Sequence, residues 1–149
     1  FDLVVASVHS RFQLSEEEQT RRILRAMESP YVDVLGHVTG RLLLAREGYA
    51  LDMGRILRAA ADRGIALEVN AHPHRLDLDW RNLRRGLELG MKTCINPDAH
   101  SVEGLGDVAH GLGVARKGWC TAEDALNAWP LQRLLDHLRA RRRDAGGRT

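Results

Sequence analysis

The chain has 149 residues, of which 44% are hydrophobic and 28% charged, values typical of one globular domain or part of one. A formal net charge of +2 does not by itself indicate nucleic-acid binding. No apolar run approaches the ~20 residues that span a bilayer, so we expect no membrane partner, and no basic-then-apolar leader indicates export. Because Phe1 leads directly into an apolar segment, we expect the chain to be a piece of a longer polypeptide. Two distant cysteines, Cys94 and Cys120, predict free thiols.

Short apolar segments alternate with amphipathic ones along the chain. Apolar, β-branched composition predicts strands at residues 3–8, 31–35, 65–69 and 93–95. Capping residues and helical periodicity predict helices that begin after Ser15, Asp52 and Asp79, a helix over 102–114, a short one between Thr121 and Trp129, and a last one from Pro130. Residues 139–149 are expected to form a solvated basic tail, with contact to a phosphate backbone as the alternative.

This alternation predicts an α/β fold with parallel strands and right-handed crossovers. Four strands are too few to close a barrel, so the pattern alone also allows an open sheet. In both architectures the loops after the carboxyl ends of the strands build the active site.

Each predicted strand is followed by polar residues that include at least one histidine. These residues are His9 after the first strand, His37 after the second, Asn70, His72 and His74 after the third, and Asp98 and His100 after the fourth. His110 and His137 fall inside helices. A single histidine at a strand end is more often a hydrogen-bonded structural residue, but four coincident strand ends favour one shared site. Mixed nitrogen and oxygen ligands without thiolate suit Mn²⁺, Zn²⁺ or Fe²⁺.

Three segments resemble the later motifs of the polymerase and histidinol phosphatase (PHP) domain, in the form found at the C-terminus of family X DNA polymerases. They are Ser7-Val-His9-Ser, Gly36-His37-Val-Thr-Gly-Arg41 and Asn96-Pro-Asp98-Ala-His100-Ser. The resemblance covers residues 1–139 and implies the C-terminal portion of a distorted seven-stranded (β/α) barrel, with helices outside.

The resemblance also implies a cluster of up to three divalent ions, with Mn most expected and Zn or Fe as alternatives. His9, His37, Asp98 and His100 carry over as metal ligands and catalytic residues. The implied activity is phosphoester hydrolysis, as a 3′-to-5′ exonuclease and DNA end-processing module of a repair polymerase. The implied partners are DNA and the upstream part of the same polypeptide, in a cytoplasmic, nucleoid-associated protein.

The family's opening His-x-His motif and further ligands do not occur in this chain, so we expect the isolated segment to bind metal poorly and to be inactive. Other residues at the strand ends are candidates for contacting substrate or for orienting a ligand. These candidates are Arg41, Glu68, Asn70, His72, His74 and Arg75. Two alternatives stay open, a free-standing phosphatase of the histidinol phosphate type and a catalytically silent domain that supports a polymerase.

Overall fold

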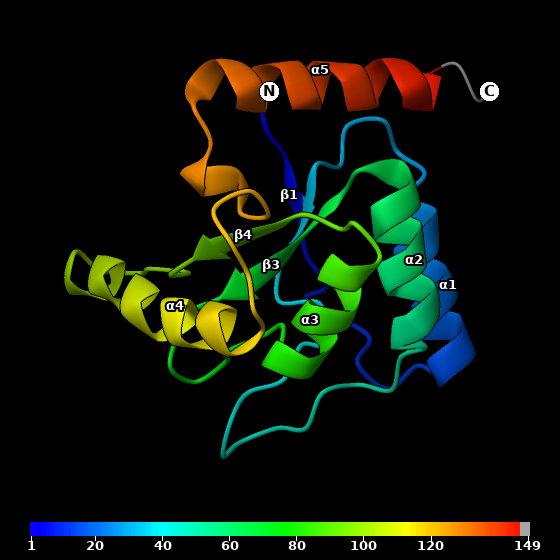
Figure 1. Cartoon of the computed structure of the whole chain (residues 1–149). Helices are drawn as coiled ribbons and strands as arrows, with labels where there is room; N and C mark the ends of the chain where they lie inside the picture. The colour runs from blue at the N-terminus through cyan, green and yellow to red at the C-terminus, as the bar shows by residue number, and fades with distance from the viewer. Residues whose placement is uncertain (147–149) are drawn as a thin grey trace.

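The computed structural model describes residues 1–146, in which short strands alternate with helices (Figure 1). The strands are β1 (Val5–Ala6), β2 (Val34–Leu35), β3 (Ala66–Asn70) and β4 (Thr93–Asn96). The α-helices are α1 (Glu16–Ala26), α2 (Met53–Arg63), α3 (Trp80–Glu88), α4 (Val108–Lys117) and α5 (Leu131–Gly146), with 3₁₀ helices at Glu103–Asp107 and Leu126–Ala128. Among the described residues, no helix has both the length and the apolar composition needed to cross a bilayer.

The strands form one parallel sheet in the order β1-β2-β3-β4. Val34 pairs with both Val5 and Ala66, so the register runs without offset from β1 to β3. The predicted α/β fold with parallel strands is therefore confirmed, and the arrangement is consistent with part of a (β/α) barrel.

Side-chain alternation gives the sheet two different faces. Leu67, Val69 and Ile95 pack in the main core with apolar side chains of α1 to α4, whereas Ala66 and Cys94 join a smaller cluster on the other face. Along β3, Glu68 and Asn70 follow Ala66 at every second position. The second face therefore changes from apolar to polar toward the carboxyl ends of the strands.

The predicted helix caps are present. Ser15 and Glu18 form a reciprocal capping box, in which Ser15 N–H donates to Glu18 Oε2 at 3.0 Å. Asp52 and Asp79 accept hydrogen bonds from the first turns of α2 and α3. Gly64 ends α2 with a φ of 64°, a conformation that glycine adopts without steric cost.

Helix α5 lies across the amino ends of the strands (Figure 1), held by a buried ion pair. Arg141 Nη2 lies 2.6 Å from Asp33 Oδ1, and Arg142 Nη2 lies 2.7 Å from Asp33 Oδ2. Arg142 also donates to the carbonyls of Phe1 and Asp2. The expectation of a solvated tail from residue 139 is therefore wrong at Arg141 and Arg142, which neutralise Asp33, whereas Arg139, Arg143 and Asp144 are exposed as expected. Residues 147–149 lie outside the described residues.

Four predicted elements are shorter or different. Of the strand expected over 31–35, β2 covers only Val34 and Leu35. Strand β1 covers only two residues, and Leu3 and Val5 are 41% and 46% exposed rather than buried, because among residues 1–146 β1 has a partner strand on one edge only. The helix expected over 102–114 is divided into a 3₁₀ helix and α4 beside Gly104 and Gly106, residues of low helix propensity. The short helix before Trp129 is a single 3₁₀ turn.

Candidate active site at the carboxyl ends of the strands

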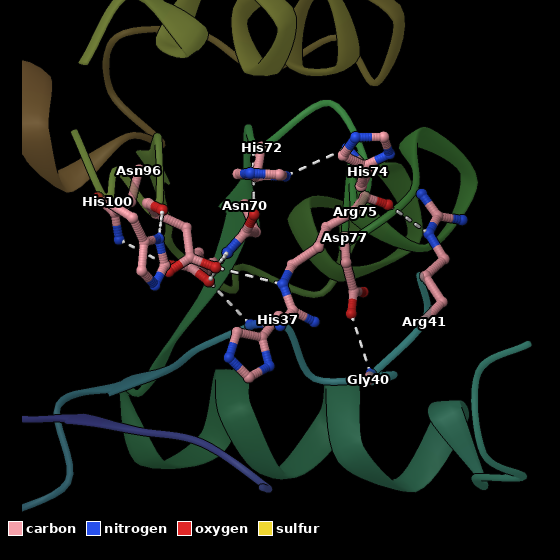
Figure 2. A network of polar contacts seen from close by, with 12 residues as sticks. His37, Gly40, Arg41, Asn70, His72, His74, Arg75, Asp77, Asn96 and His100 are labelled. Carbon is pink, nitrogen blue, oxygen red and sulfur yellow. Dashed lines mark hydrogen bonds and ion pairs between the residues drawn. The ribbon is translucent and has the colours of Figure 1, made fainter. Parts of the chain in front are cut away.

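The loops after the four strands lie at the end of the sheet opposite to α5 and carry the residues selected from the sequence. Figure 2 shows this region, with His37, Asn70, Asn96 and His100 around one network of polar contacts. His9 lies beside it, with its ring edge-on to that of His37 at a centroid distance of 5.1 Å. The sheet therefore brings His9, His37, Asp98 and His100 to one region of the molecule.

Glu68 connects three of the strand ends. Its Oε2 accepts hydrogen bonds from His37 N–H at 2.8 Å and Asn70 Nδ2 at 3.1 Å, and its Oε1 accepts from Asn96 Nδ2 at 2.8 Å. Gly36 is required next to it, because a Cβ at that position would lie 2.6 Å from Ser7 Oγ. The carboxylate of β3 thus fixes the backbone on which the His37 ring is mounted.

His37 is buried, and its Nδ1 has no hydrogen-bond partner among the described residues. Burial lowers the pKa of His37, and the nearby positive charge of Arg75 lowers it further. The imidazole is therefore neutral near pH 7, with a lone pair available to a ligand. Neutral imidazole is the form that binds metal ions.

Asp98 and His100 form a tight turn after β4. The ring Nδ1 of His100 lies 2.7 Å from the carbonyl oxygen of Asp98, and because a carbonyl can only accept, Nδ1 carries the proton. The lone pair of His100 is therefore on Nε2, which points away from this turn. A backbone bond of this type commonly orients a metal-binding histidine.

Arg75 and Asn70 both bind the carboxylate of Asp98. Oδ2 accepts from Asn70 Nδ2 at 3.0 Å and lies 3.2 Å from Arg75 Nε. Both charged side chains are partly buried, with exposed fractions of 18% and 28%. Asp98 thus has a positively charged partner from its own chain.

The guanidinium of Arg41 contacts the backbone of the loop after β3. It donates to the backbone carbonyls of Arg75, at 2.8 Å, and Leu76. It therefore supports the loop after β3 and leaves only part of its donor set for a substrate phosphate.

His72 and His74 lie on the opposite side of this network from His37 (Figure 2). His74 N–H donates to His72 Nδ1 at 3.2 Å, and their ring centroids are 5.5 Å apart. His74 is exposed, and His72 N–H donates to Asn70 Oδ1 at 3.1 Å, so the pair lies at the outer edge of the network.

Two residues of this region were not selected from the sequence as site residues. Asn96 contacts Glu68, and Asp77 is a buried carboxylate whose Oδ2 accepts hydrogen bonds from Thr39 N–H, Thr39 Oγ1 and Gly40 N–H. Burial raises the pKa of Asp77 to about 6. The Asp77 carboxylate holds the loop that carries His37. Its position between Leu76 and Leu78 in the sequence indicates that it is buried, but does not indicate that it binds Thr39 and Gly40.

The side chains of this region supply part of the ligand set that a divalent ion needs. The neutral His37, the free Nε2 of His100 and the Asp98 carboxylate suit Mn²⁺, Zn²⁺ or Fe²⁺ in chemical type. Within residues 1–146, however, no three His, Cys, Asp or Glu side chains converge closely enough to hold an ion. The residues therefore fit a metal site as part of its ligand set, with no complete set formed by the described residues alone.

A scan of protein-family models finds no match to this chain. Comparison with individual proteins shows that the chain is related to proteins named as probable phosphatases. It is 26% identical over 155 residues to one from Thermoanaerobacter, covering 98% of this chain and 60% of the relative. It is 32% identical over 111 residues to another from Vibrio parahaemolyticus, covering 68% of this chain and 42% of the relative.

A more specific relative is the DNA polymerase/3′-5′ exonuclease PolX of Bacillus subtilis. The two are 40% identical over 131 residues, which is 88% of this chain and 23% of the polymerase. The chain thus spans about a quarter of this relative and about three fifths of the Thermoanaerobacter phosphatase.

Proposed function

We propose that this chain is the C-terminal part of a PHP phosphoesterase domain that acts as the 3′-to-5′ exonuclease and DNA end-processing module of a family X repair polymerase. The observation that carries the proposal is the presence of His9, His37, Asp98 and His100 after four successive parallel strands, in a chain 40% identical to PolX. The upstream part of the same polypeptide would complete both the barrel and the ligand set. We expect a cytoplasmic, nucleoid-associated protein.

In this proposal His9, His37, Asp98 and His100 hold divalent ions, most of all Mn²⁺, with Zn²⁺ or Fe²⁺ as alternatives. Such ions, when bound, polarise a phosphoryl oxygen and activate water. Glu68 keeps His37 in position through its backbone N–H, and the Asp98 carbonyl keeps the proton of His100 on Nδ1. Arg75 lies next to Asp98 and supplies donors for a substrate phosphate oxygen.

A second function is favoured by the matches to probable phosphatases, which cover up to 98% of the chain. In that case the same residues would hydrolyse a small phosphate monoester such as histidinol phosphate. The two functions use the same metal ligands and differ in the size of the substrate. Comparing the rates of hydrolysis of a large and a small substrate therefore distinguishes them.

The test uses the full-length polypeptide with Mn²⁺ and a 3′-labelled DNA oligonucleotide. We expect Asp98→Ala and His100→Ala to abolish removal of the 3′ nucleotide while nucleotide addition continues. His110→Ala, on the exposed surface of α4, is the matched control and should retain both activities.

Unchanged hydrolysis in Asp98→Ala would refute the proposal. Loss of both activities in the same variant would indicate that the domain only supports the polymerase. Faster hydrolysis of histidinol phosphate than of DNA would favour the second function. The isolated segment should be inactive.

A further inference from the structure

A groove rich in arginine lies between α1 and the loop that follows β1. Its volume is about 520 Å³, and it is lined by Ser10, Arg11, Leu14, Arg21, Arg22 and Arg25, together with Glu18. We call it the arginine groove. Because Ser10 directly follows His9, one end of the groove lies next to the candidate active site.

The groove carries an excess of positive charge, of which the Glu18 carboxylate near Arg21 offsets a part. Within residues 1–146, none of its four arginines forms an ion pair with a carboxylate. Glu18 is the one carboxylate in the lining, and its Oε2 is engaged by Ser15 N–H at 3.0 Å and Ser15 Oγ at 2.6 Å. The four arginines and this carboxylate give the lining a net charge of +3.

The arginines differ in what they are free to bind. Arg22 is half-buried and donates to the Ser10 carbonyl at 2.8 Å, which attaches the loop after His9 to α1. Arg11, Arg21 and Arg25 are exposed. Arg22 thus shapes the groove, while the other three present guanidiniums to solvent.

The spacing of these charges favours an extended anion. Arg21 and Arg25 are four residues apart on a helix, a separation of about 6 Å along its axis. A single phosphate is held by guanidiniums that converge on one point, whereas charges repeated along a line match repeated phosphates. Guanidinium groups also pair with phosphate oxygens in a bidentate manner. No aromatic side chain lines the described groove, so it offers contacts to a backbone and none for base stacking.

We propose that the arginine groove is the path of a single-stranded nucleic acid, whose backbone phosphates contact Arg11, Arg21 and Arg25 and whose end reaches the active site beside His9. This inference rests on the proposed function, and it selects a polymeric substrate over a small phosphate monoester. Binding through the groove is independent of sequence and sensitive to salt, because each phosphate contact releases counterions.

The test compares two doubly substituted full-length proteins with the unmodified one. Arg21→Gln/Arg25→Gln removes two groove charges from exposed helical positions. Arg133→Gln/Arg139→Gln removes two charges from α5 at the opposite end of the sheet and is the matched control. Glutamine has a helix propensity close to that of arginine, so both variants should fold, which circular dichroism checks.

Binding of a fluorescent 20-nucleotide oligothymidylate is measured by anisotropy over a range of salt concentrations. The slope of log affinity against log salt should become shallower by about 1.4 in the groove variant, at about 0.7 per lost contact on a single strand, and should be unchanged in the control. A polymerase region in the full-length chain would contribute equally to all three proteins. An unchanged slope in the groove variant, or the same change in both variants, overturns the inference.

Hydrolysis separates this inference from the proposed function. The groove variant should degrade the oligonucleotide more slowly but cleave bis(4-nitrophenyl) phosphate at the unmodified rate, because the small ester does not reach the groove. If the unmodified protein cleaves neither substrate, the proposed function fails, while the salt slope still reports whether the groove binds a strand. Equal loss of both activities in the groove variant counts against the groove.

Discussion

The guanidinium Nε of Arg75 lies 3.2 Å from Oδ2 of Asp98, so a cation of the chain itself binds the carboxylate that we propose as a metal ligand. Arg75 also lowers the pKa of His37, which shows that its charge is felt at a second proposed ligand. A metal ion bound to Oδ2 of Asp98 would compete with Arg75 for that oxygen and displace its guanidinium. The released guanidinium would then be available to a substrate phosphate.

Arg75→Gln is therefore expected to raise the affinity of the full-length protein for Mn²⁺, roughly tenfold, since about 1.4 kcal/mol corresponds to a factor of ten. The substitution removes both a competitor for Asp98 and a repelling charge. Isothermal titration with MnCl₂ measures the change. Arg55→Gln, which breaks only an exposed ion pair with Glu17, is the control and should not alter the affinity. Weaker binding in Arg75→Gln would contradict the prediction.

Glu68→Gln should lower the free energy of unfolding by about 1–3 kcal/mol. Glu68 accepts three hydrogen bonds and donates none, so the amide NH₂ of glutamine would face a donor, either Asn96 or the pair of His37 and Asn70. Urea denaturation measures the loss. Glu88→Gln, at an exposed position of α3, provides the comparison and should change the stability by less than about 0.5 kcal/mol.

The pH dependence of stability should carry the signature of Asp77. Its pKa of about 6 lies above the ordinary value of 3.8, so between these values the native state holds a proton that the unfolded state has released. The contribution of Asp77 to stability is full below pH 3.8, decreases as the pH rises to 6, and stays constant above. Each pKa unit corresponds to about 1.36 kcal/mol, so the decrease is on the order of 3 kcal/mol.

Asp77→Asn removes this titration. The difference in unfolding free energy between the variant and the unmodified protein should therefore shift in favour of the variant as the pH rises from 4 to 6. Urea denaturation at a series of pH values measures it. The same series with Asp62→Asn, at an exposed position of α2, should show no comparable shift. A difference for Asp77→Asn that does not depend on pH would show that the carboxyl group titrates alike in both states.

The ion pair between Arg141 and Asp33 should be a large single contribution to stability. The side chain of Asp33 is fully buried, so Arg141→Met would leave a buried carboxylate with only part of its compensation and should cost about 3–5 kcal/mol. The double variant Asp33→Asn/Arg141→Met should recover part of this loss, because it removes both charges together. Chemical denaturation of the unmodified protein, the single variants Asp33→Asn and Arg141→Met, and the double variant measures the coupling between the two side chains. Losses of stability that add in the double variant would contradict the prediction. Arg139→Gln, which affects an exposed pair, is the control.

The features that depend on residues close together in the chain were predicted from the sequence. The caps at Ser15, Asp52 and Asp79 and the order of strands and helices follow from local patterns, and the sheet has the predicted parallel topology. The placement of His9 and His37 near each other follows from that topology, since parallel strands end at the same side of a sheet.

The sequence did not predict which polar partners would meet. Asp77 holds Thr39 across 38 residues, and Arg141 meets Asp33 across 108 residues, so neither pair lies within the reach of a local pattern. The exposure of Leu3 and Val5 was missed for a related reason. Apolar composition indicates a strand, but burial depends on whether a neighbouring strand and helix cover it.

Buried Cys94, in the apolar part of the sheet face that also carries Glu68 and Asn96, gives the molecule a chemical property separate from its proposed activity. Burial raises the pKa of Cys94 to about 12 and that of Cys120 to about 11, so both thiols stay protonated in the folded protein at neutral pH. The thiolate is the form of cysteine that attacks alkylating reagents. Because Cys94 is also buried, its alkylation measures how often the chain opens, whereas the half-buried Cys120 is accessible to reagent in the folded protein. A gel assay for alkylation can follow both reactions.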